Sequence, residues 1–328
     1  MFPWKVTFAA CIGLVAMGSQ GCIFKKKGDD GTVDSGTAGA VVDEGPLQFA
    51  PIVQFDQLMW ENFPVLYYIP PDPVAVVYAF HGSNGGTGYC SKIETIATLN
   101  ELILADMGFI CTESTDRGTG KWNQSDGFNS NEDLQRLFGL HDELVATTDL
   151  TNQTPVFTFG FSGGGSMSTF FIDAALDQGL DARAAAPHMS SGQAWGMDFP
   201  VIWVIADNDP QPEAVAEAES RMDAGLTTGL HFCPEVAISE DYFTKNPNVT
   251  LETSTKTFNE AVRLELVDEK GVRIFPIEEA ENWLSTFERE STLSSASLRT
   301  EELRVAFAMH RMNGMYARDV RDFFLDAL

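Results

Sequence analysis

Segments typical of strands alternate with amphipathic segments along most of the chain. Strand-like runs, most of them rich in Val, Ile, Phe and Tyr, occupy 64–70, 74–80, 109–113, 156–161, 182–187 and 201–206. Apolar residues at helical spacing occupy 91–106, 131–148, a segment that begins at 167, and 316–328. The run at 74–80 (VAVVYAF) is apolar throughout, which is the pattern of a strand covered on both faces.

This alternation predicts an α/β fold with a mainly parallel sheet and helices on both faces. The folded domain is expected at 47–328. In open sheets of this kind the working site lies beyond the carboxyl ends of the strands, so candidate residues are expected there.

Residues 1–22 have the layout of a secretory signal. Lys5 supplies a positive charge, an apolar stretch covers 6–17, and small residues surround the Gly21-Cys22 pair. That pair resembles the end of a bacterial lipoprotein signal, and the resemblance implies that Cys22 is lipidated. Residues 23–46 are rich in Gly, Asp and Thr, which predicts a flexible acidic linker to a membrane.

Two other interpretations of the N-terminus stay open. Ser19 and Gln20 stand where lipoprotein signals prefer an aliphatic and a small residue, so a freely secreted product is one alternative. The three lysines at 25–27 favour an uncleaved membrane anchor, because a basic cluster can halt export. The preferred interpretation is an exported bacterial protein, either a cell-envelope lipoprotein or a secreted one.

The chain of 328 residues carries 21 Lys and Arg against 47 Asp and Glu, a formal net charge of −26, and 44% of it is hydrophobic. This composition is that of a folded globular protein. A surface with so large an acidic excess repels phosphate backbones, so no nucleic-acid partner is expected.

Three of the five cysteines, Cys90, Cys111 and Cys233, lie in the predicted domain. An exported protein could pair two of them, and the sequence alone does not decide which. The chain has no CxxC pair and no Cys/His cluster of the kind that binds metal, so neither a metal nor a cofactor is expected.

The sharpest chemical motif is GFSGGG at 160–165, which contains G-x-S-x-G between a predicted strand and a predicted helix. Glycines on both sides allow the tight turn that exposes the hydroxyl of Ser162. The N–H groups at the start of the following helix would point toward an oxyanion formed above it. Ser162 is therefore the candidate nucleophile.

A nucleophilic serine needs a base and an orienting acid. His310 is the preferred base because it follows an apolar run and precedes the terminal helix, and His231 is its main rival. Asp209 is the preferred acid because it lies a few residues past the strand at 201–206, with Asp207 as the alternative. The order Ser, Asp, His is that of α/β-hydrolases.

Residues from about 55 to 328 resemble the α/β-hydrolase superfamily, particularly secreted esterases of the polyhydroxyalkanoate depolymerase and feruloyl esterase kind. The resemblance depends on YAFHGSNGG, GFSGGGS, VIWVIADNDP and a late His before an amphipathic helix. It implies an oxyanion hole formed by the backbone N–H groups of Ser83 and Gly163.

The 101 residues between Asp209 and His310 exceed the usual spacing, so an insertion at about 211–300, before the last strand, is expected. It would contain a hairpin in 263–277 and a helix at about 278–290, and it is either a cap over the site or peripheral packing. Trp122 and Trp195 follow strand ends and are candidate substrate-binding residues.

These features predict an exported serine esterase that cleaves carboxylic esters through an acyl-enzyme intermediate, with small or polymeric esters as substrates. A peptidase or acyltransferase would use the same triad. A non-catalytic surface lipoprotein that uses the fold as a binding scaffold is the alternative from another class.

Overall fold

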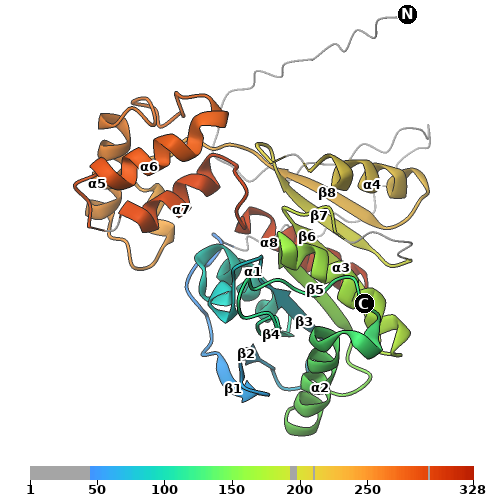
Figure 1. Cartoon of the computed structure of the whole chain (residues 1–328). Helices are drawn as coiled ribbons and strands as arrows, with labels where there is room; N and C mark the ends of the chain where they lie inside the picture. The colour runs from blue at the N-terminus through green and yellow to red at the C-terminus, as the bar shows by residue number, and fades with distance from the viewer. Residues whose placement is uncertain (1–44, 193–197, 210, 295) are drawn as a thin grey trace, which may run out of the picture. The chain divides into compact units, whose positions relative to one another are not determined.

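The computed structural model describes residues 45–192, 198–209, 211–294 and 296–328, and its centre is an eight-stranded sheet (Figure 1). The strands are β1 (Asp56–Trp60), β2 (Phe63–Tyr68), β3 (Ala75–Phe80), β4 (Met107–Cys111), β5 (Val156–Phe161), β6 (Ala182–His188), β7 (Val201–Ala206) and β8 (Thr228–Cys233). The predicted signal, Cys22 and nearly all of the predicted linker lie outside the described residues.

The sheet has the order β1-β2-β4-β3-β5-β6-β7-β8. The pairings of β2 with β1 and with β4 are antiparallel, and those that join β4, β3, β5, β6, β7 and β8 are parallel. The predicted strands are confirmed, with bounds shifted by two residues at most. Because the central strands are parallel, the loops after β3, β5 and β7 leave the sheet at one edge.

Helices cover both faces of this sheet. The α-helices are α1 (Ile93–Leu104), α2 (Glu132–Thr147), α3 (Gly163–Asp177), α4 (Pro212–Asp223), α5 (Leu251–Arg263), α6 (Ala280–Glu290), α7 (Ala296–Ala306) and α8 (Ala317–Asp326). Buried side chains of α2, α3 and α4 form one core with the sheet, around Phe171 and Trp203. Those of α1 and α8 form a second core on the opposite face, around Phe157 and Phe324. The predicted mainly parallel sheet with helices on both faces is confirmed.

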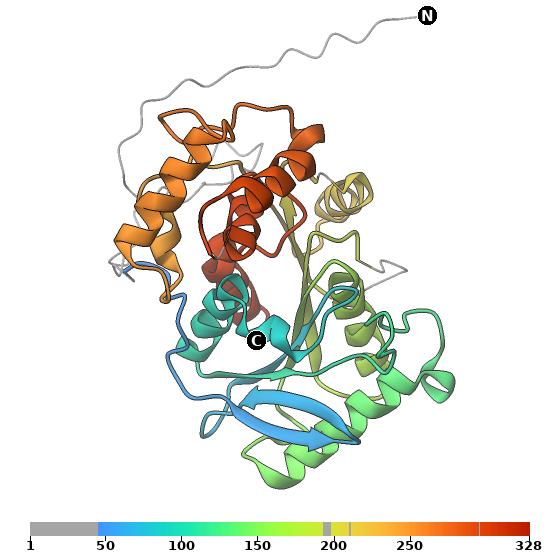
Figure 2. The ribbon, with the colours of Figure 1, turned by 60° about the vertical axis from the view of Figure 1, so that its left-hand side comes forward.

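Helices α5, α6 and α7 form a third core of their own, around Phe243, Phe287 and Phe307. Figure 2 shows these orange and red helices well apart from the blue β1–β2 hairpin, as does Figure 1. We call residues 234–306 the helical insertion.

The predicted insertion at 211–300 before the last strand is wrong at its start. Helix α4 and strand β8 belong to the sheet layer, and β8 pairs with β7 over its whole length, so the helical insertion follows the last strand. The sequence of β8 gave no strand pattern because an edge strand that is only half-buried needs no continuous apolar run. The helix predicted at 278–290 is confirmed by α6.

The hairpin predicted in 263–277 is present only as a tight turn. Residues 251–263 are helical, and a single bridge joins Val267 to Arg273 around Gly271. The turn residues there are right, but the flanking segments are too short to extend the ladder.

The disulfide joins Cys90 to Cys111, and Cys233 is a buried free thiol. Cys90 lies in the 3-10 helix η1 (Thr87–Ser91), which follows the loop after β3, and Cys111 ends β4. The bridge therefore fastens the segment that leaves the β3 loop to the neighbouring strand. In the part of the chain that the structure describes, no helix is long and apolar enough to span a bilayer.

Candidate active site

Ser162 occupies the turn between β5 and α3 in a backbone conformation with positive φ, at φ 54° and ψ −121°. A positive φ is unfavourable for a serine and costs about 1–3 kcal/mol, so the surroundings must hold it. One support is its backbone N–H, which donates to the carbonyl oxygen of His188 at 2.9 Å. The turn places the Ser162 side chain at the carboxyl edge of the sheet, as the motif predicts.

Two glycines allow the start of α3 to approach the strands closely. A Cβ at Gly164 would stand 2.1 Å from the carbonyl oxygen of Phe80, and one at Gly160 would stand 2.1 Å from that of Gly164. Both distances are far inside van der Waals contact, so only glycine permits this approach of α3 to the strands. The glycines of GFSGGG thus serve close packing in addition to the turn.

His310 lies in the loop between α7 and α8, and its Nδ1 is hydrogen bonded to Oδ2 of Asp209 in the loop after β7. The bond leaves the imidazole Nε2 available to another group. The imidazole is partly exposed, with 40% of its side-chain surface accessible, whereas Asp209 is 21% accessible. The structure therefore brings together the preferred base and the preferred acid from positions 101 residues apart.

The other four histidines are in surroundings that do not suit a base. His81 and His141 are buried, and burial lowers the pKa of each. Burial and, to a smaller extent, the charge of His231 together lower the pKa of His188 to about 3. His231, the predicted rival base, lies on β8 with its ring 4.6 Å from that of Tyr316, and burial lowers its pKa too.

Residues next to Asp209 make hydrogen bonds to its carboxylate and to the loop that carries His310. Gln211 Nε2 donates to Asp209 Oδ1 at 2.9 Å, so both carboxylate oxygens have a partner. Asn208 donates from its side chain to Phe307 O at 2.7 Å and from its backbone to Ala308 O at 3.1 Å. Asp207, the alternative acid, donates its N–H to Cys233 O instead.

The predicted oxyanion residues lie next to each other. A Cβ built on Gly163 would be 3.0 Å from Ser83 Oγ and 3.5 Å from Ser83 N, so the loop after β3 meets the first turn of α3. Among the described residues, no acceptor is hydrogen bonded to the N–H of Ser83 or of Gly163. The carbonyl of Gly163 accepts from Gln124 Nε2 at 2.6 Å, which holds the peptide on the other side.

His81 and Trp122 shape that loop. The His81 ring bonds Gly82 O through Nδ1 at 2.8 Å and accepts from the N–H of Ser114 through Nε2 at 3.2 Å, which requires a neutral ring. The lowered pKa of His81 agrees with this state. Trp122 is buried and donates from Nε1 to His81 O at 2.9 Å. Its position indicates support for the loop, whereas Trp195 lies outside the described residues.

His310 packs beside the residue that precedes Ser162, since the ring of Phe161 lies 5.0 Å from the imidazole. No hydrogen bond joins Ser162 to His310 among the described residues, and catalytic hydrogen bonds are often long until substrate is bound.

A separate cavity of about 480 Å³ lies between the β1–β2 hairpin and η1, and none of the predicted site residues lines it. Within the described ranges, no group of three or more His, Cys, Asp or Glu could hold a metal ion.

The strand order, the strained serine turn after β5 and the sequence order Ser162, Asp209, His310 define the α/β-hydrolase fold. No protein-family model matches the chain, and no curated protein sequence matches it either.

Several solved structures share part of this fold. An arylesterase is 16% identical, with a TM-score of 0.42, over 63% of this chain and 83% of its own. An esterase/lipase from an uncultured bacterium is 12% identical, with a TM-score of 0.41, over 68% and 89%. A carboxylesterase from Mesorhizobium loti is 12% identical, with a TM-score of 0.40, over 54% and 88%. With TM-scores near 0.4, an activity has to be assigned from the residues of this chain's own site.

The sequence did not reveal Asn208, Gln211, Gln124 or the residue after the histidine, Arg311. Each makes its contact either with a segment distant in sequence or with a neighbour in an irregular loop. Neither kind of contact produces a periodic pattern in the sequence. The one available signal was position, because each of the four lies within two residues of a predicted site residue.

We expect Gly164→Ala to destabilise the fold by about 3 kcal/mol, near the upper end of the usual cost of overpacking, because the new methyl group would overlap the Phe80 carbonyl and displace backbone. Chemical denaturation followed by circular dichroism measures the change. Gly88→Ala is the matched control, since a Cβ there meets no atom within 4 Å. Equal stability of the two variants would contradict the close approach.

Proposed function

We propose that this chain is a serine hydrolase that cleaves carboxylic esters with Ser162 as nucleophile, His310 as base and Asp209 as orienting acid. The observation that carries the proposal is the hydrogen bond between His310 and Asp209 at the sheet edge where the strained Ser162 turn lies. Motif resemblance to secreted esterases supports an ester rather than an amide as substrate.

In this mechanism His310 Nε2 accepts the hydroxyl proton of Ser162 while Oγ attacks the ester carbonyl carbon. Asp209 holds the imidazole through Nδ1 and stabilises the positive charge that it acquires. The N–H groups of Ser83 and Gly163 stabilise the oxyanion. His310 then protonates the leaving alcohol, and water releases the acid by the reverse sequence.

We expect Ser162→Ala and His310→Ala each to lower kcat for p-nitrophenyl butyrate by three or more powers of ten, roughly what loss of a triad member costs. Labelling of the full chain with a fluorophosphonate probe should disappear in both variants. Labelling that survives His310→Ala would place the base elsewhere. A folded wild-type chain that is neither labelled nor active would refute the esterase proposal and favour a binding scaffold.

The acid also depends on Gln211, which is left-handed at φ 42° and contacts Asp209. We expect Gln211→Gly to leave the melting temperature equal or higher, because glycine adopts this φ without strain. The same change should lower kcat several-fold, because Oδ1 of Asp209 loses the hydrogen bond from Gln211 that helps to fix the carboxylate. Glu265→Gly, at an exposed left-handed position in the helical insertion, is the control and should leave kcat unchanged. An unchanged kcat in Gln211→Gly would refute this role.

We also propose that the protein is exported and attached to a membrane through a lipidated Cys22. The layout of residues 1–22 supports export, and so does the Cys90–Cys111 disulfide, because disulfides persist mainly in oxidising compartments.

Expression of the full chain in a bacterium with radiolabelled palmitate tests the attachment. We expect label in the wild type and none in Cys22→Ser, which should appear in the soluble fraction. Cys233→Ser is the matched control, because it also removes a free thiol, one that is buried in the folded domain. Soluble, unlabelled wild-type protein would favour free secretion.

A further inference from the structure

The loop that carries His310 begins where the helical insertion ends. Helix α7 stops at Ala306, and Phe307, the next residue, is fully buried in the core of the insertion. Ala308 then takes a left-handed conformation at φ 48°, after which the chain has no regular structure until Gly314. The imidazole of His310 is therefore carried by a short irregular segment, which has local backbone hydrogen bonds on either side of the histidine, from Met309 N to Arg304 O at 2.9 Å and from Arg311 N to Met309 O at 2.7 Å.

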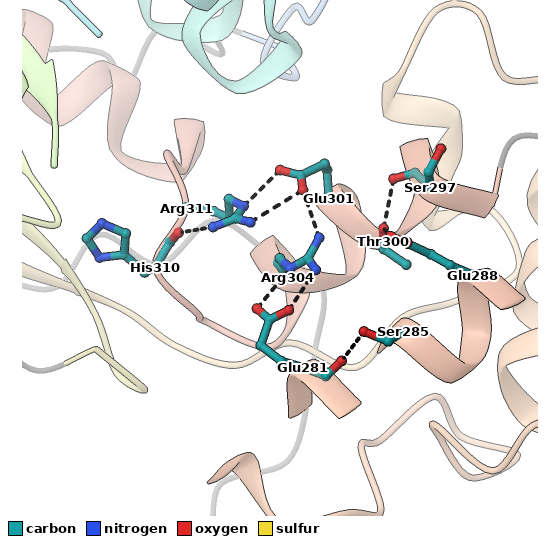
Figure 3. Close-up of polar contacts among 9 residues, drawn as sticks. All are labelled: Glu281, Ser285, Glu288, Ser297, Thr300, Glu301, Arg304, His310 and Arg311. Carbon is teal, nitrogen blue, oxygen red and sulfur yellow. Dashed lines mark hydrogen bonds and ion pairs between the residues drawn. The ribbon is translucent and has the colours of Figure 1, made fainter. Parts of the chain in front are cut away.

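Arg311, the residue after His310, connects this segment to the insertion. Its Nη1 donates to the carbonyl oxygen of His310 at 2.7 Å, and its Nε donates to Oε2 of Glu301 on α7 at 2.8 Å. Figure 3 shows the His310 ring pointing away from these ion pairs while its carbonyl oxygen faces the guanidinium. A single planar group thus fixes the backbone of the histidine and leaves the ring free to act.

Glu301 is itself held by further charges. Arg304 donates to it at 2.7 Å and forms an ion pair with Glu281 on α6 at 2.7 Å, so the chain of contacts reaches two helices (Figure 3). Burial acts to raise the pKa of Glu301, but the hydrogen bond from Arg311 and the charges of Arg311 and Arg304 outweigh it, and the pKa is lowered. The carboxylate is therefore ionised at neutral pH and available to Arg311.

The rest of the loop is anchored on both sides of Arg311. Before it, Asn208 bonds the carbonyls of Phe307 and Ala308. After it, the N–H of Gly314 donates to Glu94 Oε2 on α1 at 2.8 Å, and Glu94 pairs with Lys245 of the insertion at 2.7 Å. Between these anchors, Arg311 makes the contact that fixes the carbonyl of His310.

We propose that Arg311 is a positioning residue for His310, and that the helical insertion serves through Glu301 as the support against which the base is held. The proposal extends the function proposed above, in which His310 is the base. A misplacement of about 1 Å is enough to cost roughly a hundredfold in rate, so a contact that orients the backbone of a base has a large effect on turnover. The Arg311–Glu301 ion pair is partly exposed and such pairs contribute little to stability, so its loss need not unfold the chain.

The test compares Arg311→Met, Arg311→Lys and Glu301→Gln in the full chain. For p-nitrophenyl butyrate we expect Arg311→Met to lower kcat about tenfold with KM within twofold, because the contact acts on the transition state and not on substrate binding. Arg311→Lys keeps a donor that reaches either partner, so it should retain at least a third of kcat. Glu301→Gln should fall between them.

Lys256→Met is the matched control, because it breaks an exposed ion pair with Glu252 on α5 of the same insertion. It should leave kcat unchanged, and the melting temperature of Arg311→Met should lie within a few degrees of its value. An unchanged kcat in Arg311→Met would overturn the proposal. So would a loss of kcat that Arg311→Lys does not relieve or that accompanies an equal loss of thermal stability.

A second readout keeps the test independent of activity. We expect the proton between His310 Nδ1 and Asp209 to give a downfield resonance in the proton NMR spectrum. Its loss in Asp209→Asn would assign the resonance to this hydrogen bond. We expect this resonance to be lost or broadened in Arg311→Met and retained in Lys256→Met and Ser162→Ala. If the wild type neither reacts with the probe nor turns over ester, the proposed function fails. The resonance then decides the positioning role alone, and its persistence in Arg311→Met would overturn it.

Discussion

The hydrogen bond between His310 and Asp209 is the interaction on which the candidate site depends. It joins two loops whose residues are 101 positions apart in the sequence, and the contacts around the acid and the base hold one or the other of these loops. Strand β7 delivers Asp209 to the carboxyl edge of the sheet, and Gln211 fixes the second carboxylate oxygen. The histidine side has no strand beneath it and relies on Asn208, Arg311 and Glu94.

The part of the site around Ser162 depends on glycines, whose lack of a side chain lets backbone segments approach each other closely. Helix α3 approaches β3 and β5 so closely that neither Gly164, against β3, nor Gly160, on β5, has room for a methyl group. This approach sets the strained turn of Ser162 and brings Gly163 to Ser83. Backbone proximity therefore places the proposed nucleophile and oxyanion residues, whereas polar side-chain contacts place the proposed acid and base.

The difference explains how much the sequence could predict. Backbone devices leave a local signature, so GFSGGG identified Ser162 and the apolar runs identified the central strands within two residues. Tertiary side-chain contacts leave none, so Gln211 and Arg311 emerged only from the structure. The edge strand β8 was missed for a related reason, since its half-buried residues lack the continuous apolar run that marks its neighbour β7. That omission displaced the start of the insertion.

The place of the helical insertion in the chain also bears on the order in which the domain is assembled. As the polypeptide emerges from its N-terminal end, Ser162 and Asp209 are present well before the segment that carries His310. The position of the proposed base depends on the core around Phe243, Phe287 and Phe307, because Phe307 belongs to that core and leads directly into the histidine loop. Closing a loop of this length costs conformational entropy that only late contacts repay. Completion of the site thus reports that the most distant part of the fold has formed, and a nascent or partly folded chain lacks its base.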